Sequence, residues 1–189
     1  MSDSHRPRAV LDADIIYSRV LHELIGRAAA ELRLLDLFWS GQLLEEAQSS
    51  LVEKKGLPAD SAGRWVDHLR RNFPEGRVEL GEPAVSDLAS LTSDPADAHV
   101  CALALAAQAD YLFTHDRGYL RDALSGHGVR VLTPDEFLAP AFDADRQGML
   151  GVLRWQADIW AGGRTIEVLL DTIERAGAPA FAAKVREYL

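Results

Sequence analysis

The sequence predicts an α/β protein built around a mainly parallel sheet. Strand-like runs alternate with helix-like segments over about the first 130 residues, which favours a sandwich of helices around parallel strands. After Pro140 the pattern changes to helices alone. With 189 residues, the chain is long enough for one such core and an extension. We therefore predict a domain over residues 1–138 and a helical extension packed on it over residues 139–189.

The first elements follow in chain order. Residues 8–12 form a short apolar run that ends in an acid, which is typical of a strand. The apolar periodicity of residues 17–38 indicates one or two helices. Ser40 is placed to cap the next helix, which ends at residues 54–58, K-K-G-L-P. A further helix is predicted over residues 59–73.

The second half of the domain continues the alternation. Residues 77–80, 111–114 and 129–132 have the composition of short strands. Residues 94–107 and 118–124 lie between them and are helical in pattern. The predicted order of strands and helices is therefore that of a sheet whose strands run in one direction.

The last predicted helix of the domain has a clear start signal. Residues 133–136, T-P-D-E, match a capping box with proline at the first helical position. Beyond it, residues 144–160, 165–176 and 179–188 indicate three further helices. These helices form the predicted extension.

Composition limits the classes of function. Acidic residues outnumber basic ones by 29 to 20, giving a net charge of −9, which disfavours a nonspecific duplex binder. The only cysteine, Cys101, has no partner for an intramolecular disulfide, so a reducing, cytoplasmic setting is expected. The first residues lack the apolar core of a signal peptide, and no run approaches the ~20 apolar residues that span a bilayer. We expect no membrane partner.

Four aspartates are predicted to meet at one edge of the sheet. Asp12 and Asp14 follow the first strand, Asp116 follows the strand at 111–114, and Asp97 lies in the first turn of a helix. Strand carboxyl ends and helix amino ends share one edge of a parallel α/β sheet, where ligand sites form. A glutamate from the helix that Ser40 caps is placed to complete the group from the side: Glu45 or Glu46.

Such a cluster needs a counter-charge. Two like charges a few ångströms apart cost roughly 4 kcal/mol at an effective dielectric of about 20. No lysine lies near these segments, and the histidines His99 and His115 lack the spacing that zinc prefers. Oxygen ligands favour a hard cation such as Mg²⁺ or Mn²⁺, which activates water and neutralises a phosphodiester. Metal-dependent phosphodiester hydrolysis is the leading hypothesis.

Each acid also has a simpler interpretation. Asp94 precedes a proline and is typical of a helix cap. The simpler interpretation of Asp97 is that it complements the helix dipole and binds no ligand. Asp116 could form a turn, and Glu46 could lie on a solvated helix face. Asp12, directly after an apolar strand, is the least easily explained this way. Two residues of the helix after Asp97 are interpreted as packing residues: His99 and Cys101.

Four ordered motifs resemble the PIN-domain nucleases, in particular the VapC-like toxins of bacterial toxin–antitoxin pairs. The stretches are V-L-D-A-D-I-I-Y, F-W-S-G-Q-L-L-E-E-A, D-P-A-D-A-H-V-C-A-L-A-L-A-A and A-D-Y-L-F-T-H-D-R-G-Y-L. L-T-P-D-E-F-L closes the domain as in many relatives, and the helical tail is similar to that of one subgroup. The resemblance covers residues 8–138 closely. It implies a three-layer α/β/α sandwich.

The resemblance also assigns roles to residues. Asp12, Glu46, Asp97 and Asp116 match the catalytic acids, which would hold one or two Mg²⁺ or Mn²⁺ ions. Glu46 is chosen over Glu45 from its place before A-Q-S-S-L. Asp14 stands where asparagine is common, so it is either a further ligand or a supporting residue. Two further residues are assigned supporting roles: Thr114 and Asp94.

The implied activity is endonucleolytic RNA cleavage by a metal-activated water, without a covalent intermediate. Structured RNA such as tRNA or rRNA is the implied substrate, and relatives commonly dimerise and are silenced by a small antitoxin. Residues 54–77 carry six bases against three acids, which agrees with a local RNA contact or simply with a solvated helix face. The arginines proposed to contact RNA are Arg64, Arg70, Arg71, Arg117 and Arg121.

Two other functions remain open from the sequence. D-A-D after the first strand resembles the motif of haloacid-dehalogenase-like phosphatases, in which Asp12 would attack phosphate and Asp14 would act as the acid. Those enzymes need a lysine near the phosphate, and none is well placed here. A catalytically silent RNA- or partner-binding domain is the second alternative. The four intact acids favour the nuclease.

Overall fold

The centre of the molecule is a parallel sheet. The structure is a computed structural model that describes residues 6–81, 88–160, 163 and 165–189. Four strands pair in the order β2-β1-β3-β4, and all three pairings are parallel. The predicted fold class is thereby confirmed. The strands are β1 (Arg8–Leu11), β2 (Asp36–Phe38), β3 (Tyr111–Phe113) and β4 (Arg130–Leu132).

The register of the two central strands determines where the site forms. Leu11, the last residue of β1, pairs with Phe113, the last residue of β3. The backbone N–H of Asp12 then donates to the carbonyl oxygen of Phe113 at 3.0 Å, which extends the pairing by one residue. Because both strands end at the same level, the residues that follow them leave the sheet side by side.

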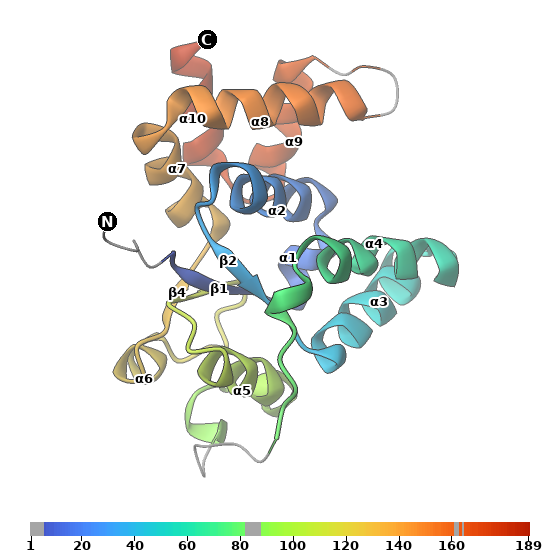
Figure 1. Cartoon of the computed structure of the whole chain (residues 1–189), viewed down its shortest axis with the longest axis vertical. Helices are drawn as coiled ribbons and strands as arrows, with labels where there is room; N and C mark the ends of the chain where they lie inside the picture. Colours follow the sequence, from blue (N-terminus) through green and yellow to red (C-terminus); the bar gives the residue numbers. More distant parts are fainter. Residues whose placement is uncertain (1–5, 82–87, 161–162, 164) are drawn as a thin grey trace.

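Helices cover both faces of the sheet, which gives three layers. In Figure 1, α2 lies over one face, while α5 and α6 lie over the other. α3 and α4 pack against each other beside α1, at the edge where β1 ends. The helices of this part are α1 (Ala13–Tyr17), α2 (Arg19–Leu32), α3 (Gly41–Lys55), α4 (Ala59–Asn72), α5 (Ala98–Ala106), α6 (Arg121–Gly126) and α7 (Pro134–Ala144). Three short 3-10 turns are η1 (Pro74–Gly76), η2 (Leu88–Ser90) and η3 (Pro95–Asp97).

The predicted helix starts at Ser40 and Thr133 are confirmed. The Ser40 hydroxyl accepts from the N–H of Leu43, satisfying one of the donors left unpaired at the start of α3. Thr133 and Glu136 form a complete capping box at the start of α7, each side chain accepting from the other's backbone N–H. Local sequence therefore determined both starts.

Two predicted elements are wrong. Residues 17–38 are not helical throughout: α2 ends at Leu32, Arg33 takes a left-handed conformation, and β2 follows. Residues 77–80 do not form a strand, because Arg77 makes only one isolated parallel bridge, with Trp39. The side chains of residues 77 and 79 are exposed and pair with each other, while Val78 and Leu80 are partly buried against the core without extending the strand pairing.

The C-terminal helices pack directly against the helices of the α/β domain. They are α8 (Arg146–Ile159), α9 (Ile166–Arg175) and α10 (Pro179–Tyr188). α8 lies against α2, where the Gln156 amide donates to the carbonyl oxygen of Val20 at 3.1 Å, and α10 lies against α7. The proposed boundary after residue 138 falls inside α7. Among the described residues, no helix has the length and apolar character needed to cross a membrane.

Candidate functional site

Asp12 is the buried centre of the carboxylate cluster. One of its oxygens, Oδ1, accepts from the N–H of Ala13 at 2.7 Å, so Asp12 caps α1. The other, Oδ2, accepts from the Thr114 hydroxyl at 2.7 Å. The side chain is 6% exposed, and burial, then the charge of Asp14, raise its pKa to about 7 in spite of these hydrogen bonds. The protein alone therefore does not fully stabilise the charged form of Asp12.

The loop after β3 carries the next two predicted residues. The Thr114 hydroxyl, which donates to Asp12, also accepts from the backbone N–H of Asp116 at 2.9 Å. The Asp116 carboxylate accepts from the N–H of Gly118 at 2.6 Å. One hydroxyl thus links the buried aspartate that follows β1 to the loop of Asp116.

Asp14 is held by His115. Its Oδ2 accepts from the backbone N–H of His115 at 2.9 Å and lies 3.3 Å from Nδ1 of the same residue. The hydrogen bond to Asp14 is the largest cause that raises the pKa of His115, and one to the Gly177 backbone adds to it. The other oxygen of Asp14, Oδ1, is buried without a hydrogen-bond partner among the described residues. One oxygen of Asp14 is therefore hydrogen-bonded to His115, and the other is buried without a hydrogen-bond partner in the described part of the chain.

Asp97 and Glu46 form the other part of the cluster. Burial raises the pKa of Asp97 to about 6, and the charges of Asp116, Asp94 and Glu46 add to the shift. The Asp97 atom Oδ2 is buried and, in the described part of the chain, has no hydrogen-bond partner. Asp94 accepts from the N–H of Ala96 at 2.9 Å, which is the capping geometry considered for it. The acids thus influence one another across elements far apart in sequence.

Two neighbours of the acids were missed by the sequence analysis. His99 Nε2 lies 3.1 Å from Oε2 of Glu46, and that contact is the largest cause that raises the His99 pKa. His99 is therefore not only a packing residue. The buried hydroxyl of Tyr119 lies near Asp12, and its pKa is raised by burial and then by the charges of Asp12 and Asp97. The sequence did place His99 two residues after Asp97 and Tyr119 three residues after Asp116, and this proximity could have indicated their positions beside the acids.

The cluster suits a hard divalent cation in its chemistry. Its donors are carboxylate oxygens. Three of them, on Asp14, Glu46 and Asp97, are buried and have no hydrogen-bond partner among the described residues, although that of Glu46 lies 3.1 Å from His99 Nε2. The mutual repulsion of these acids would be relieved by positive charge. In the described ranges, however, no three side chains of His, Cys, Asp or Glu are grouped closely enough to hold one ion. The donor type fits Mg²⁺ or Mn²⁺, and ligation requires the side chains to move closer together.

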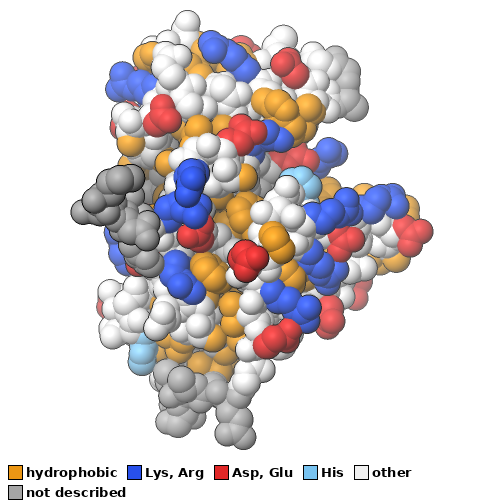
Figure 2. All heavy atoms as spheres, in the orientation of Figure 1, with side chains coloured by type: hydrophobic (Ala, Val, Ile, Leu, Met, Phe, Trp, Pro, Cys, Tyr) orange, Lys and Arg blue, Asp and Glu red, His pale blue; other side chains and the backbone are white. Residues whose placement is uncertain are grey.

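The arginines proposed for RNA contact differ in what they already bind. Arg70 and Arg71 both pair with Asp67, with nitrogen–oxygen distances of 2.7 and 3.7 Å, and Arg121 lies 3.5 Å from Glu136. Arg117 is exposed in the loop beside Asp116. Figure 2 shows Lys and Arg side chains along the α3 and α4 side of the molecule, interleaved with acids. The basic patch is thus partly neutralised within the chain.

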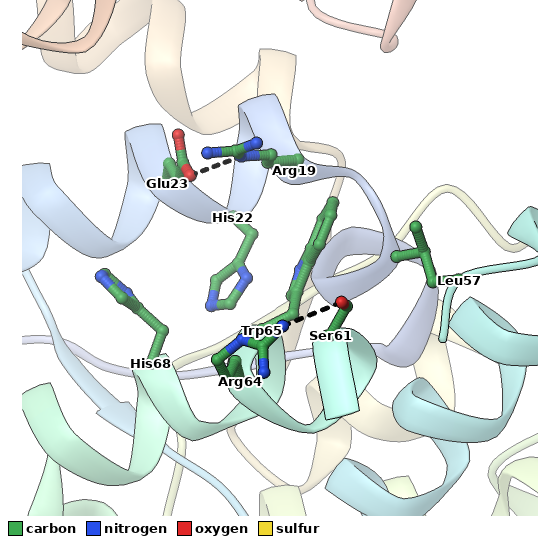
Figure 3. Close-up of a pocket in the computed structure, with 8 residues that line it drawn as sticks. All are labelled: Arg19, His22, Glu23, Leu57, Ser61, Arg64, Trp65 and His68. Atoms are coloured by element: carbon green, nitrogen blue, oxygen red, sulfur yellow. Dashed lines mark hydrogen bonds and ion pairs between the residues drawn. The ribbon is translucent and has the colours of Figure 1, made fainter. Parts of the chain in front are cut away.

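Arg64 lines a separate pocket of about 420 Å³ between α2 and α4 (Figure 3). Its guanidinium donates to the hydroxyl of Ser61 at 3.0 Å. His22, on the opposite wall, is fully buried, and burial followed by the neighbouring His68 lowers its pKa to about 3. None of the predicted catalytic acids lines this pocket. Its lining consists of Arg19, His22, Glu23, Leu57, Ser61, Arg64, Trp65 and His68.

The fold and the site together define a class: an α/β/α sandwich with an all-carboxylate cluster where its central strands end. Comparison with known families identifies that class. The family model of the PIN domain matches residues 8–118, more than half of the chain, and the chain belongs to this family. The model of the VapC50 C-terminal domain matches residues 134–187. The chain is therefore a VapC-like PIN-domain protein, a class of nuclease toxins.

The comparisons with curated proteins and with solved structures found no match. The phosphatase alternative gains no support from the lysines. Lys55 donates to the carbonyl oxygen of Tyr17 at 2.6 Å, and Lys184 pairs with Asp143. The PIN-domain match covers the D-A-D segment on which that alternative depended.

Proposed function

We propose that the protein is a divalent-metal-dependent endoribonuclease and the toxin of a toxin–antitoxin pair. The observation that carries this proposal is the electrostatic coupling of the acids. The pKa values of Asp12 and Asp97 are raised to about 7 and about 6, by burial first and then by the charges of neighbouring carboxylates. A purely structural site has no need for that repulsion, whereas a cation site depends on it. Membership of the PIN-domain family supports the same conclusion.

The residues proposed to hold Mg²⁺ or Mn²⁺ are Asp12, Glu46, Asp97 and Asp116. When bound, such an ion supplies a water of lowered pKa and neutralises charge on the phosphodiester. The chain's own residues orient the ligands. Thr114 fixes Oδ2 of Asp12, and His99 restrains Glu46 through its contact with Oε2. With these restraints, less side-chain freedom is lost when the ligands come together.

The substrate proposed is structured RNA, such as tRNA or rRNA. Arg117 is beside Asp116 in the chain and is the basic residue best placed to meet a phosphate near the acids. Arg64, with a hydroxyl as its partner, is more available than Arg70, whose guanidinium is paired with Asp67. A cognate antitoxin is supported by the VapC family match, and homodimerisation and action in the cytoplasm belong to the same proposal.

Cleavage of a purified structured RNA tests the proposal. We expect cleavage with Mn²⁺ or Mg²⁺, complete loss with EDTA, and recovery when excess Mn²⁺ is restored. Asp12→Ala and Asp97→Ala should each abolish cleavage while circular dichroism shows a folded protein.

A matched control is Asp60→Ala, because Asp60 is an exposed acid in the first turn of α4 and outside the cluster. This variant should cleave as the parent does. Cleavage that persists in the Asp12→Ala, Asp97→Ala double variant would contradict the metal-carboxylate proposal.

A further inference from the structure

The C-terminal extension reaches the carboxylate cluster at one point. The turn between α9 and α10 places the backbone of Gly177 against the imidazole ring of His115. A methyl group at position 177 would overlap Nε2 of that ring and come within 3.1 Å of Cε1. On its other side the ring meets Asp14, with Nδ1 3.3 Å from Oδ2. The His115 ring is thus flanked by the extension on one side and by an acid of the cluster on the other, and it stays partly exposed.

Gly177 has its position because of how α9 ends. Its φ of +101° lies in the left-handed region, and its N–H donates to Glu174 O at 3.0 Å. The next N–H, of Ala178, donates to Ile173 O at 3.1 Å, which completes a Schellman motif. Glycine is therefore favoured twice at this position, once by the backbone conformation and once by the ring that lies where a side chain would begin.

The turn is fixed relative to the sheet. The carboxylate of Asp135, near the start of α7, accepts from the backbone N–H groups of Ala180 and Phe181 at 3.1 and 2.8 Å. The ring of Phe181 packs edge to face on Phe142 of α7. Because α7 begins directly after β4, the position of Gly177 is linked to the sheet by a short, well-packed path.

Movement of His115 would affect the cluster in two ways. Its backbone N–H and ring both contact Oδ2 of Asp14, so a displaced His115 releases that carboxylate. It also lies between Thr114, which donates to Asp12, and Asp116. A shift of one residue in this loop therefore changes the placement of three acids.

We propose that Gly177 and His115 form a positioning contact through which the C-terminal extension holds Asp14 and the Thr114–Asp116 loop in place, so that the other acids of the cluster close on a divalent cation from this fixed side. The proposal rests on the proposed function for its consequence, cation affinity. It gives the extension a role in the nuclease site. His115 and Gly177 act through Asp14 and the loop and do not themselves touch the cation.

The test compares two glycine substitutions with the same backbone cost. Gly128 also ends a helix with a Schellman motif, has a φ of +85°, and has nothing within 4 Å of the position of an added methyl group. Gly177→Ala and Gly128→Ala share the cost of the left-handed backbone, and Gly177→Ala alone adds the overlap with the His115 ring. By calorimetry, only Gly177→Ala should bind Mn²⁺ more weakly, by about 10-fold or more, the usual effect of removing support from a metal ligand.

A double-mutant cycle assigns the effect to the ring. In a His115→Ala background, Gly177→Ala should produce no further loss of Mn²⁺ affinity, because the overlapping ring is gone. Additive losses would overturn the contact as the cause. Unchanged Mn²⁺ affinity in folded Gly177→Ala would overturn the proposal outright.

Amide hydrogen exchange without metal separates this inference from the proposed function. The N–H groups of His115 and Asp116 donate to Asp14 and Thr114, so their exchange should accelerate in Gly177→Ala and not in Gly128→Ala. If the parent protein binds no Mn²⁺, the proposed function fails, and the exchange data still decide whether the contact positions the loop. Equal exchange in both variants would overturn it.

Discussion

The carboxylate cluster has two halves that are built differently. The strand half, Asp12 and Asp14, follows β1 and is tied by hydrogen bonds to the loop after β3. The helix half, Glu46 and Asp97, projects from α3 and the start of α5, and its pairing is largely confined to the contact of Glu46 with His99. The first half is arranged before a cation arrives, and the second has more freedom to close on it. This difference predicts unequal effects of substitution.

The largest difference should appear in cleavage rate. Asp12→Asn should lower kcat/KM for RNA by at least about 1,000-fold, since it removes the charge of the buried, pre-oriented ligand. Glu46→Gln should lower it by about 10- to 100-fold, because a more exposed ligand can be replaced by water. Glu45→Gln, on the exposed side of the same helix, is the control and should have no effect. Equal losses for Asp12→Asn and Glu46→Gln would contradict the two-part description.

The next effect is on stability without metal. The folded-state pKa of Asp12, about 7, lies above its ordinary value of 3.8, so folding favours the protonated form. The resulting stabilisation is complete below about pH 4 and is lost as the pH rises through about 7. In EDTA at pH 8, Asp12→Asn should be more stable than the parent by about 3 kcal/mol in urea unfolding, and the gain should disappear near pH 4.

Mn²⁺ supplies the complementary measurement. At pH 8, Mn²⁺ should raise the unfolding free energy of the parent and have little effect on that of Asp12→Asn, because the variant lacks the charge of the central ligand, Asp12. If the difference in unfolding free energy between the parent and Asp12→Asn is the same at pH 4 and pH 8, folding does not disfavour the charged form of Asp12.

The smallest effect concerns the Thr114 hydroxyl, which links the ends of β1 and β3. Thr114→Val keeps the shape of the side chain and removes its hydrogen bonds to Asp12 and Asp116. We expect a loss of about 1–2 kcal/mol in unfolding free energy at pH 8, where Asp12 is charged. Thr114→Ser retains the hydroxyl and should recover most of that loss. If valine and serine behave alike, the hydroxyl does not orient Asp12.

The sequence predicted the elements whose signals are local. The caps at Ser40 and Thr133 and the burial of β1 could be derived from neighbouring residues. The strand at Asp36–Phe38 could not, because Leu35 and Leu37 fit the apolar period of the preceding helix equally well. Only pairing with β1, distant in the chain, decides between the two interpretations.

The same distinction applies to the site. The prediction that Asp12, Asp97 and Asp116 lie at one edge used only the rule for parallel strands. The contact of His99 with Glu46 depends on how α5 packs beside α3, and that of His115 with Gly177 depends on the docking of the last two helices. Neither follows from residue spacing, since each joins segments whose relative placement is set by tertiary packing.

The continuity of α7 has a practical meaning for dissection of the protein. This helix starts at the capping box after β4 and ends against the extension, with Phe142 in contact with Phe181. A truncation after residue 138 would cut the helix in its middle and expose Leu138, which is fully buried. The PIN domain and the helical extension therefore share α7, and variants and truncations should be designed for the two parts together.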